Sequence, residues 1–185
     1  MFSSAYTQLN NFLQTITEIP ENEVKKLTSI FKPLSLPIGQ FFIRTGEIPT
    51  QIGFVASGLL RLYYVNDKGV EFTKSFCEEN EFVAAYSALI LNKASQFFIE
   101  ALEESLLLVT DYVNYQELCT EHPCWQIIKH KFVEALFIKK EKREGELLLD
   151  DATTRYTKFL IEYPTLENRV KQYHIAAEKI LRPGL

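Results

Sequence analysis

Residues 51–76, QIGFVASGLLRLYYVNDKGVEFTKSF, decide the fold of this chain. The polar turn Asn66–Gly69 separates the apolar run Leu59–Val65 from the run Val70–Phe76. Short β-branched and aromatic runs on either side of a turn predict strands. The glycine of this turn tolerates the positive φ that tight hairpin loops require. The stretch therefore predicts a β-hairpin, and Gln51–Val55 predicts a strand before it.

The same pattern extends from Leu34 to Asp111. Further short strands are predicted at Phe41–Arg44, Phe97–Leu102 and Leu106–Asp111. The segment Phe82–Leu91 is rich in alanine and serine and does not predict a strand clearly. Several short strands separated by turns favour a β-sandwich or a jelly-roll barrel.

Helical patterns precede the strand-rich region. Apolar residues recur at steps of three and four from Ser3 to Ile19, which predicts an amphipathic helix that Pro20 ends. A second short helix is predicted from about Glu23 to Phe31, and Pro33 stops it.

Helical patterns also follow that region. A long helix is predicted from Pro123 to about Glu144, and an amphipathic helix containing Leu148 and Leu160 is predicted to end at Tyr163-Pro164. A last helix is expected to start near Leu166 or Asn168.

The long helix carries apolar residues on more than one side, so packing against one barrel would not bury all of them. Contact with a second copy would cover the rest, and homodimerisation is preferred over purely intramolecular packing. The residues assigned to the dimer helix are Trp125, Ile128, Phe132 and Leu136.

Composition narrows the class of protein. The 185 residues carry a net charge of -4, so no overall positive field points to nucleic acid or an anionic membrane. The apolar runs are far shorter than the roughly 20 residues of a membrane span, and no secretory signal is evident. A cytoplasmic location without membrane contact is expected.

The cysteines and histidines do not indicate a cofactor or an enzyme. Cys77, Cys119 and Cys124 contain no Cys-x-x-Cys pair, which fits buried thiols in a reducing compartment better than disulfides or a metal site. All three histidines lie outside the predicted barrel, and no Ser/His/Asp set or phosphate-binding glycine loop can be assembled. Haem stays open as a minor alternative, with Cys77 and His122 as the axial ligands on offer.

The order of these elements resembles the Crp/Fnr family of bacterial transcription regulators, and specific residues carry the resemblance. The motifs that match its cyclic-nucleotide-binding-like domain are Leu36-Pro37-x-Gly39, Gly46-Glu47 and Phe54-Val55-x-x-Gly58-Leu59-Leu60-Arg61-Leu62-Tyr63. Those that match the approach to its helix-turn-helix are Asp151-Ala152-x-x-Arg155-Tyr156, Phe159-Leu160, Pro164 and Val170-x-x-x-x-Ile175-Ala176.

The phosphate cassette of the cyclic-nucleotide-binding members is not matched. The family places a Gly-Glu pair before a short helix and an arginine downstream, which together hold the cyclic phosphate. Here Ala84-Ala85 replaces the Gly-Glu pair, Ser95-Gln96-Phe97 replaces the arginine segment, and Lys93 is the nearby cation. Cyclic AMP is therefore not the expected effector. The residues assigned to the degenerate pocket, which either bind a neutral or weakly polar effector or simply fill the barrel, are Ala84, Ala85, Tyr86, Ser87, Ser95, Gln96 and Phe97.

The family's helix-turn-helix is also matched only in part. Val170–Ala177 resembles its first helix, but the eight residues that follow contain a Pro-Gly pair and are too few for a turn and a recognition helix. Weak or non-specific DNA contact is expected. The candidate residues for this contact are Arg169, Lys171, Gln172 and Lys179.

The sequence thus predicts an α+β protein of three parts. Residues 1–121 form N-terminal helices and a jelly-roll effector domain, residues 122–145 a dimerisation helix, and residues 146–185 a partial winged-helix DNA-binding domain. The resemblance implies a non-enzymatic, homodimeric transcription regulator that senses an unknown small effector. The alternative is a sensor or dimerisation module that acts through protein partners without binding DNA.

Overall fold

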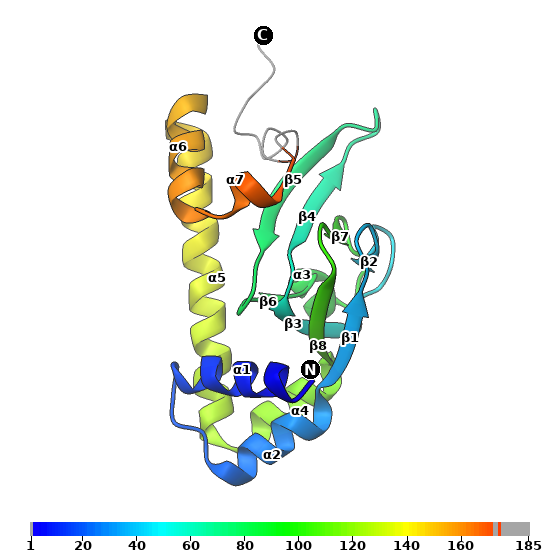
Figure 1. The fold of residues 1–185 in the computed structure, drawn as a ribbon, viewed down its shortest axis with the longest axis vertical. Helices are drawn as coiled ribbons and strands as arrows, with labels where there is room; N and C mark the ends of the chain where they lie inside the picture. Colours follow the sequence, from blue (N-terminus) through cyan, green and yellow to red (C-terminus); the bar gives the residue numbers. More distant parts are fainter. Residues whose placement is uncertain (1, 172–173, 175–185) are drawn as a thin grey trace.

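Two four-stranded antiparallel sheets form a jelly-roll barrel, with helices at both ends and along one side (Figure 1). The computed structural model describes residues 2–171 and residue 174. One sheet has the strand order β1-β8-β3-β6 and the other the order β2-β7-β4-β5. The strands are β1 (Lys32–Leu36), β2 (Phe41–Ile43), β3 (Gln51–Ser57), β4 (Leu60–Val65), β5 (Glu71–Cys77), β6 (Phe82–Val83), β7 (Phe98–Ala101) and β8 (Ser105–Asp111). The predicted α+β jelly roll is confirmed.

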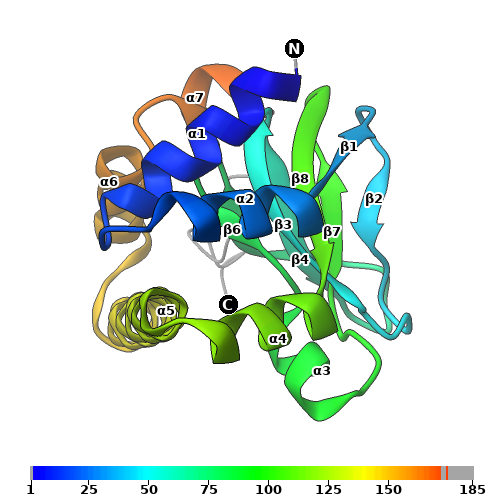
Figure 2. The same cartoon turned by 90° about the horizontal axis from the view of Figure 1, so that it is seen from below.

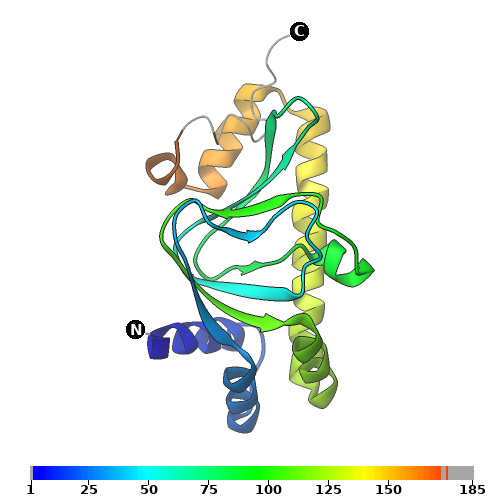
Figure 3. The ribbon, with the colours of Figure 1, turned by 90° about the vertical axis from the view of Figure 1, so that its right-hand side faces the viewer.

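The helices are distributed around this barrel. Figure 3 shows α1 and α2 at one end of the barrel and α6 toward the other end. The described helices are α1 (Phe2–Gln14), α2 (Glu21–Ile30), α3 (Tyr86–Leu91), α4 (Tyr112–Glu121), α5 (Pro123–Leu149), α6 (Ala152–Glu162) and α7 (Leu166–Arg169).

Three apolar cores hold the elements together. The barrel interior is filled by residues such as Val55, Phe97 and Leu107. A second core, which includes Leu9 and Trp125, joins α1, α2, α4 and the start of α5 to the barrel. A third joins α6 and α7 to the barrel, and one of its members is Leu166.

The Ser57–Gly58 corner shows how sequence fixes a barrel turn. Gly58 has a φ of +96°, and a Cβ built there would lie 2.7 Å from the Cα of Ser105. A side chain at this position would therefore meet both backbone strain and a steric clash.

Helix α5 contains 27 residues, so it spans about 40 Å along the side of the barrel. Its start is fixed by Pro123 and by the Nδ1 atom of His122, which accepts a hydrogen bond from the backbone N–H of Cys124 at 3.2 Å. At the other end, Asp151 begins α6 by accepting a hydrogen bond from the N–H of Thr154 at 2.7 Å. The helix therefore runs from α4 to the loop before α6 (Figures 1 and 2).

Several predicted boundaries were wrong. Helix α1 ends at Gln14, not Ile19, because the Gln14 side chain bonds to both backbone groups of Ile19 and closes a loop instead of another turn. Helix α5 continues to Leu149 and includes Leu148, which had been placed in the next helix. Helix α4 was not predicted, because it follows β8 with no intervening glycine or proline and buries only Leu118 and Cys119 among its residues.

Candidate effector region and C-terminal contact

The predicted pocket residues lie on two neighbouring segments around α3. Ala84 is half-buried and Ala85 is fully buried in the barrel core, and Ala85 caps α3 without a side-chain hydrogen bond. The six-residue helix then ends at Asn92, whose φ is +48°. The alanine side chains at the start of α3 therefore cannot make the polar contacts of the family's Gly-Glu pair.

The other segment contributes two buried side chains and one exposed side chain. The Ser95 hydroxyl is buried and donates to the carbonyl oxygen of Phe97 at 2.8 Å, so it is satisfied within its own turn. Phe97 is buried in the barrel core, whereas Gln96 is exposed. Ala85 and Phe97 thus meet in one core.

Tyr86 and Ser87 point away from that core. Tyr86 packs edge-on against Tyr112 of α4, with ring centroids 6.2 Å apart, and burial raises its pKa to about 12. Ser87 is exposed, as is Lys93. The predicted pocket residues are therefore only partly brought together.

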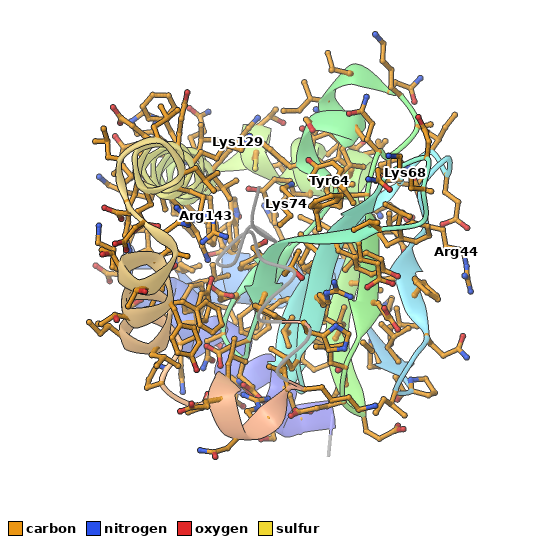
Figure 4. All side chains as sticks on the ribbon, turned by 90° about the horizontal axis from the view of Figure 1, so that it is seen from above. Arg44, Tyr64, Lys68, Lys74, Lys129 and Arg143 are labelled. Carbon is orange, nitrogen blue, oxygen red and sulfur yellow. The ribbon has the colours of Figure 1, made fainter. Side chains whose placement is uncertain are left out.

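Lys74 of β5 is a charged residue of this region that the sequence analysis missed. Its Nζ lies 3.8 Å from the centroid of the Phe97 ring, and Tyr64 meets the same ring edge-on at 5.6 Å. Burial, followed by the charge of Lys140 on α5, lowers the pKa of Lys74 to about 8. Figure 4 shows Lys74 and Tyr64 on the side of the β4–β5 hairpin that is turned toward α5. A lysine inside a predicted strand run was the available signal, although the strand pattern does not show which way that side chain points.

Arg61, the one arginine in the matched barrel motif, has a different environment. It is fully buried, donates to the Thr73 hydroxyl at 2.9 Å and to Glu71, and lies 4.3 Å from the Tyr63 ring centroid. The Thr73 hydroxyl in turn donates to the backbone oxygen of His174 at 3.0 Å. Burial comes first and Arg61 second among the causes that lower the pKa of His174 to about 4. Arg61 therefore supports the contact between the sheet and residue 174.

The four residues assigned to the dimer helix have unequal exposure. Trp125 and Ile128 are buried in the core that joins α5 to α1 and α2, and the Trp125 indole donates to the Glu23 carboxylate at 2.8 Å. Phe132 is half-buried against Phe82. Leu136 is 44% exposed. The predicted face thus turns inward at its start and outward at Leu136.

Other apolar side chains of α5 are open to a partner. They are Ile127, Val133, Phe137, Ile138, Leu148 and Leu149, of which Phe137 and Ile138 are each 64% exposed. Most of the exposed apolar side chains of α5 therefore lie after Phe132 and are not among the four residues assigned to the dimer helix from the sequence.

Arg169 of α7 is held by carboxylates of the barrel. Its guanidinium donates to both oxygens of Glu79 at 3.0 and 2.9 Å, to both oxygens of Glu103 at 3.0 and 2.7 Å, and to Glu78 at 3.4 Å. These hydrogen bonds come first among the causes that raise its pKa. Thr165 adds a hydrogen bond to Glu78 at 2.9 Å.

The other candidate DNA contacts lie beside or beyond this cluster. Lys171 is exposed, whereas Gln172 and Lys179 lie outside the described residues. The segment Val170–Ala177 begins in extended backbone at Val170, and most of it also lies outside the described residues. Figure 1 shows α7 between α6 and the β4–β5 hairpin.

Neither a metal site nor a membrane-spanning helix is found in the part of the chain that the structure describes. Within residues 2–171 and 174, no group of three or more His, Cys, Asp or Glu residues is arranged to hold a metal ion. The three cysteine thiols are free and buried, and burial raises the pKa of Cys77 well above its usual value. None of the described helices is long and apolar enough to cross a membrane.

Comparison with known proteins identifies the central domain. Residues 33–122 match the model of the cyclic nucleotide-binding domain. No curated protein sequence matches the chain.

Solved structures resemble nearly the whole chain. The catabolite activator protein of Thermus thermophilus is 18% identical with a TM-score of 0.62, over 91% of this chain and 80% of that one. A protein of Eubacterium rectale assigned to the Crp/Fnr family is 15% identical with a TM-score of 0.70, over the same shares of 91% and 80%. A CooA variant of Carboxydothermus hydrogenoformans is 21% identical with a TM-score of 0.57, over 80% of this chain and 93% of that one. At these identities the likeness establishes the fold, which the chain shares with these solved structures, and residues 33–122 are the part that matches the model of the cyclic nucleotide-binding domain.

Proposed function

We propose that the chain is a Crp/Fnr-like transcription regulator whose barrel senses a small effector other than cyclic AMP. The observation that carries this proposal is the cyclic nucleotide-binding domain at residues 33–122 with a 27-residue helix leading from it to further helices. The domain supplies a sensing module, and the long helix connects it mechanically to the C-terminal part. No enzymatic role enters the proposal.

The effector is proposed to differ from cyclic AMP because the cassette lacks its charges. Ala84 and Ala85 stand where an acidic residue would bind the ribose, and Ser95 is already satisfied by Phe97. Losing one charged partner of a buried phosphate costs roughly 2–5 kcal/mol of binding free energy, so affinity would fall by about two orders of magnitude.

Homodimerisation through α5 is the second part of the proposal. Phe137 and Ile138 expose large apolar side chains on a helix that packs against the barrel only over part of its length. A partner helix would remove this apolar area from water. Sedimentation velocity is expected to give a dimer for the wild type and a monomer for Phe137→Glu, whereas Glu141→Ala, on an exposed site of the same helix, should remain dimeric. A monomeric wild type would contradict this part.

DNA contact is assigned to the C-terminal segment through Arg169, Lys171, Gln172 and Lys179. The positive charges of Arg169, Lys171 and Lys179 support weak binding to phosphates without base recognition, and the amide of Gln172 is neutral. The test is an electrophoretic shift with a random duplex pool across a salt series. Weak, salt-sensitive binding that Lys171→Gln and Lys179→Gln reduce is expected. Absence of any binding at low salt would contradict a DNA-binding role for this chain.

A second candidate function is a sensor that acts through protein partners and not through DNA. The observation that favours it is that the barrel carboxylates occupy Arg169, the strongest candidate for a phosphate contact. Under this alternative, the electrophoretic shift should show no DNA binding even at low salt.

A further inference from the structure

Lys74 occupies an irregularity in the pairing of β4 and β5. Leu62 pairs with Ser75 and Tyr63 pairs with Thr73, so Lys74 is the extra residue of a β-bulge. A bulge changes the direction of the side chain at the inserted residue and is common next to binding sites. Here it directs the ammonium group onto the face of Phe97, 3.8 Å from the ring centroid.

The charge of Lys74 is not balanced by the protein. Among the described residues, no carboxylate lies within ion-pair distance of its ammonium group, and the charged neighbour that affects it from α5 is a second cation, Lys140. Removing a cation from water without a counterion is unfavourable, and a like charge nearby adds to the cost. The seam between the β4–β5 hairpin and α5 is therefore positively charged, and no carboxylate of the described residues pairs with Lys74 there.

Aromatic surface borders this positive site. Tyr64 is 38% exposed and meets the Phe97 ring edge-on, which leaves apolar ring surface beside the two ammonium groups. Phe97 belongs to the barrel core that also contains Ala85, so this seam adjoins the cassette region. A ligand that suits it has one negatively charged group and an apolar body.

We propose that a small organic anion binds at this seam, with its carboxylate or phosphate group at Lys74 and Lys140 and its apolar part against the exposed portion of the Tyr64 ring. This inference rests on the proposed sensing function and names the class of effector. Lysine acts as a compact point charge and makes no demand for planar, bidentate geometry, so the site needs no arginine. The anion would supply the counterion that the fold lacks.

The test uses isothermal titration of the full chain with benzoate, phenyl phosphate and the neutral benzamide. Saturable binding of the two anions but not of benzamide is expected. Lys74→Met and Lys140→Met should each weaken anion binding at least tenfold, while Lys74→Arg should retain most of it. Lys68→Met, at the exposed hairpin turn, is the matched control and should bind like the wild type.

Two further readouts separate a binding role from a structural one. Affinity for the anions should fall between about pH 7 and about pH 9 as Lys74 loses its proton, and Lys74→Arg should abolish this dependence. Without ligand, Lys74→Met should melt no lower than the wild type, because the substitution removes an uncompensated charge and keeps the apolar stem.

Several results would overturn the inference. Equal binding by Lys74→Met, stronger binding of benzamide than of benzoate, or no binding of either anion at millimolar concentration would each do so. Binding of a short DNA duplex that Lys74→Met abolishes would assign the lysines to nucleic acid instead. Equal binding by Lys74→Met, or stronger binding of benzamide than of benzoate, would still be compatible with a barrel that senses an effector. Dimer formation through α5 is measured separately and does not depend on Lys74.

Discussion

Arg169 and Glu79 form a two-bonded ion pair between α7 and the loop that follows β5, with N–O distances of 3.0 and 2.9 Å. Glu79 also accepts a hydrogen bond from the backbone N–H of Gly58 at 3.0 Å. One carboxylate thus links the C-terminal helix to a tight corner of the barrel. Leu166 of α7 is buried in the apolar core that joins α6 and α7 to the barrel.

Arg169→Gln is expected to loosen α7 from the barrel. The substitution removes the planar fork that bonds to both Glu79 and Glu103, and their partial exposure limits the loss to about 1 kcal/mol of unfolding free energy. Urea denaturation and limited proteolysis after residue 160 would detect the change. Lys171→Gln is the control, because Lys171 is exposed. Equal stability and proteolysis of the wild type and Arg169→Gln would show that the ion pairs do not hold α7.

Trp125→Phe should destabilise the junction between α2 and α5. It removes the 2.8 Å hydrogen bond from the indole to the buried Glu23 carboxylate, which keeps its ion pair with Lys26. Loss of a donor to a buried charged acceptor costs about 1–3 kcal/mol. Chemical denaturation measures the loss, and Glu23→Gln combined with Trp125→Phe should lose less than the sum of the two single variants.

The acid stability of the same junction should depend on Glu23. Hydrogen bonds from Lys26 and then from Trp125 lower the pKa of Glu23. A lowered folded-state pKa contributes stability above the unfolded value of about 4.3, and this contribution is lost as the pH falls through the folded value. Unfolding free energy measured against pH should therefore fall less steeply below about pH 4.3 in Glu23→Gln than in the wild type. Identical slopes would contradict the assignment.

Gly58→Ala tests the barrel corner. The new methyl group would meet the Ser105 backbone, and alanine at a φ of +96° is strained, so a loss of more than about 1 kcal/mol is expected. Thermal unfolding provides the measurement. Gly69→Ala is the control for backbone strain alone, since its φ is +76° but no atom lies within 4 Å of an added Cβ. Gly58→Ala should be the less stable of the two.

The barrel could be predicted from the sequence because alternation and turn residues act locally. The Asn66–Gly69 turn between Leu59–Val65 and Val70–Phe76 specifies the β4–β5 hairpin without reference to distant residues. The two-sheet strand order depends on pairings such as Gln51 with Asp111, which join distant segments. Local periodicity does not contain that order.

The candidate sites depended on contacts that local patterns do not contain. The pattern of α5 identified Trp125 and Ile128 as apolar, but only the positions of α1 and α2 show that these residues are covered within the chain. Lys74 looked like one residue of a strand, because a bulge depends on the register of the neighbouring strand. Arg169 looked like a free cation, because its three glutamates lie more than 60 residues away.

Thermal unfolding with and without millimolar cyclic AMP tests the central claim most directly, namely that the barrel senses an effector other than a cyclic nucleotide. A ligand that binds only the folded state stabilises it by RT ln(1 + [L]/Kd) and so raises the melting temperature. The account predicts an unchanged melting temperature with cyclic AMP and a rise with benzoate or phenyl phosphate. A saturable rise with cyclic AMP would contradict it.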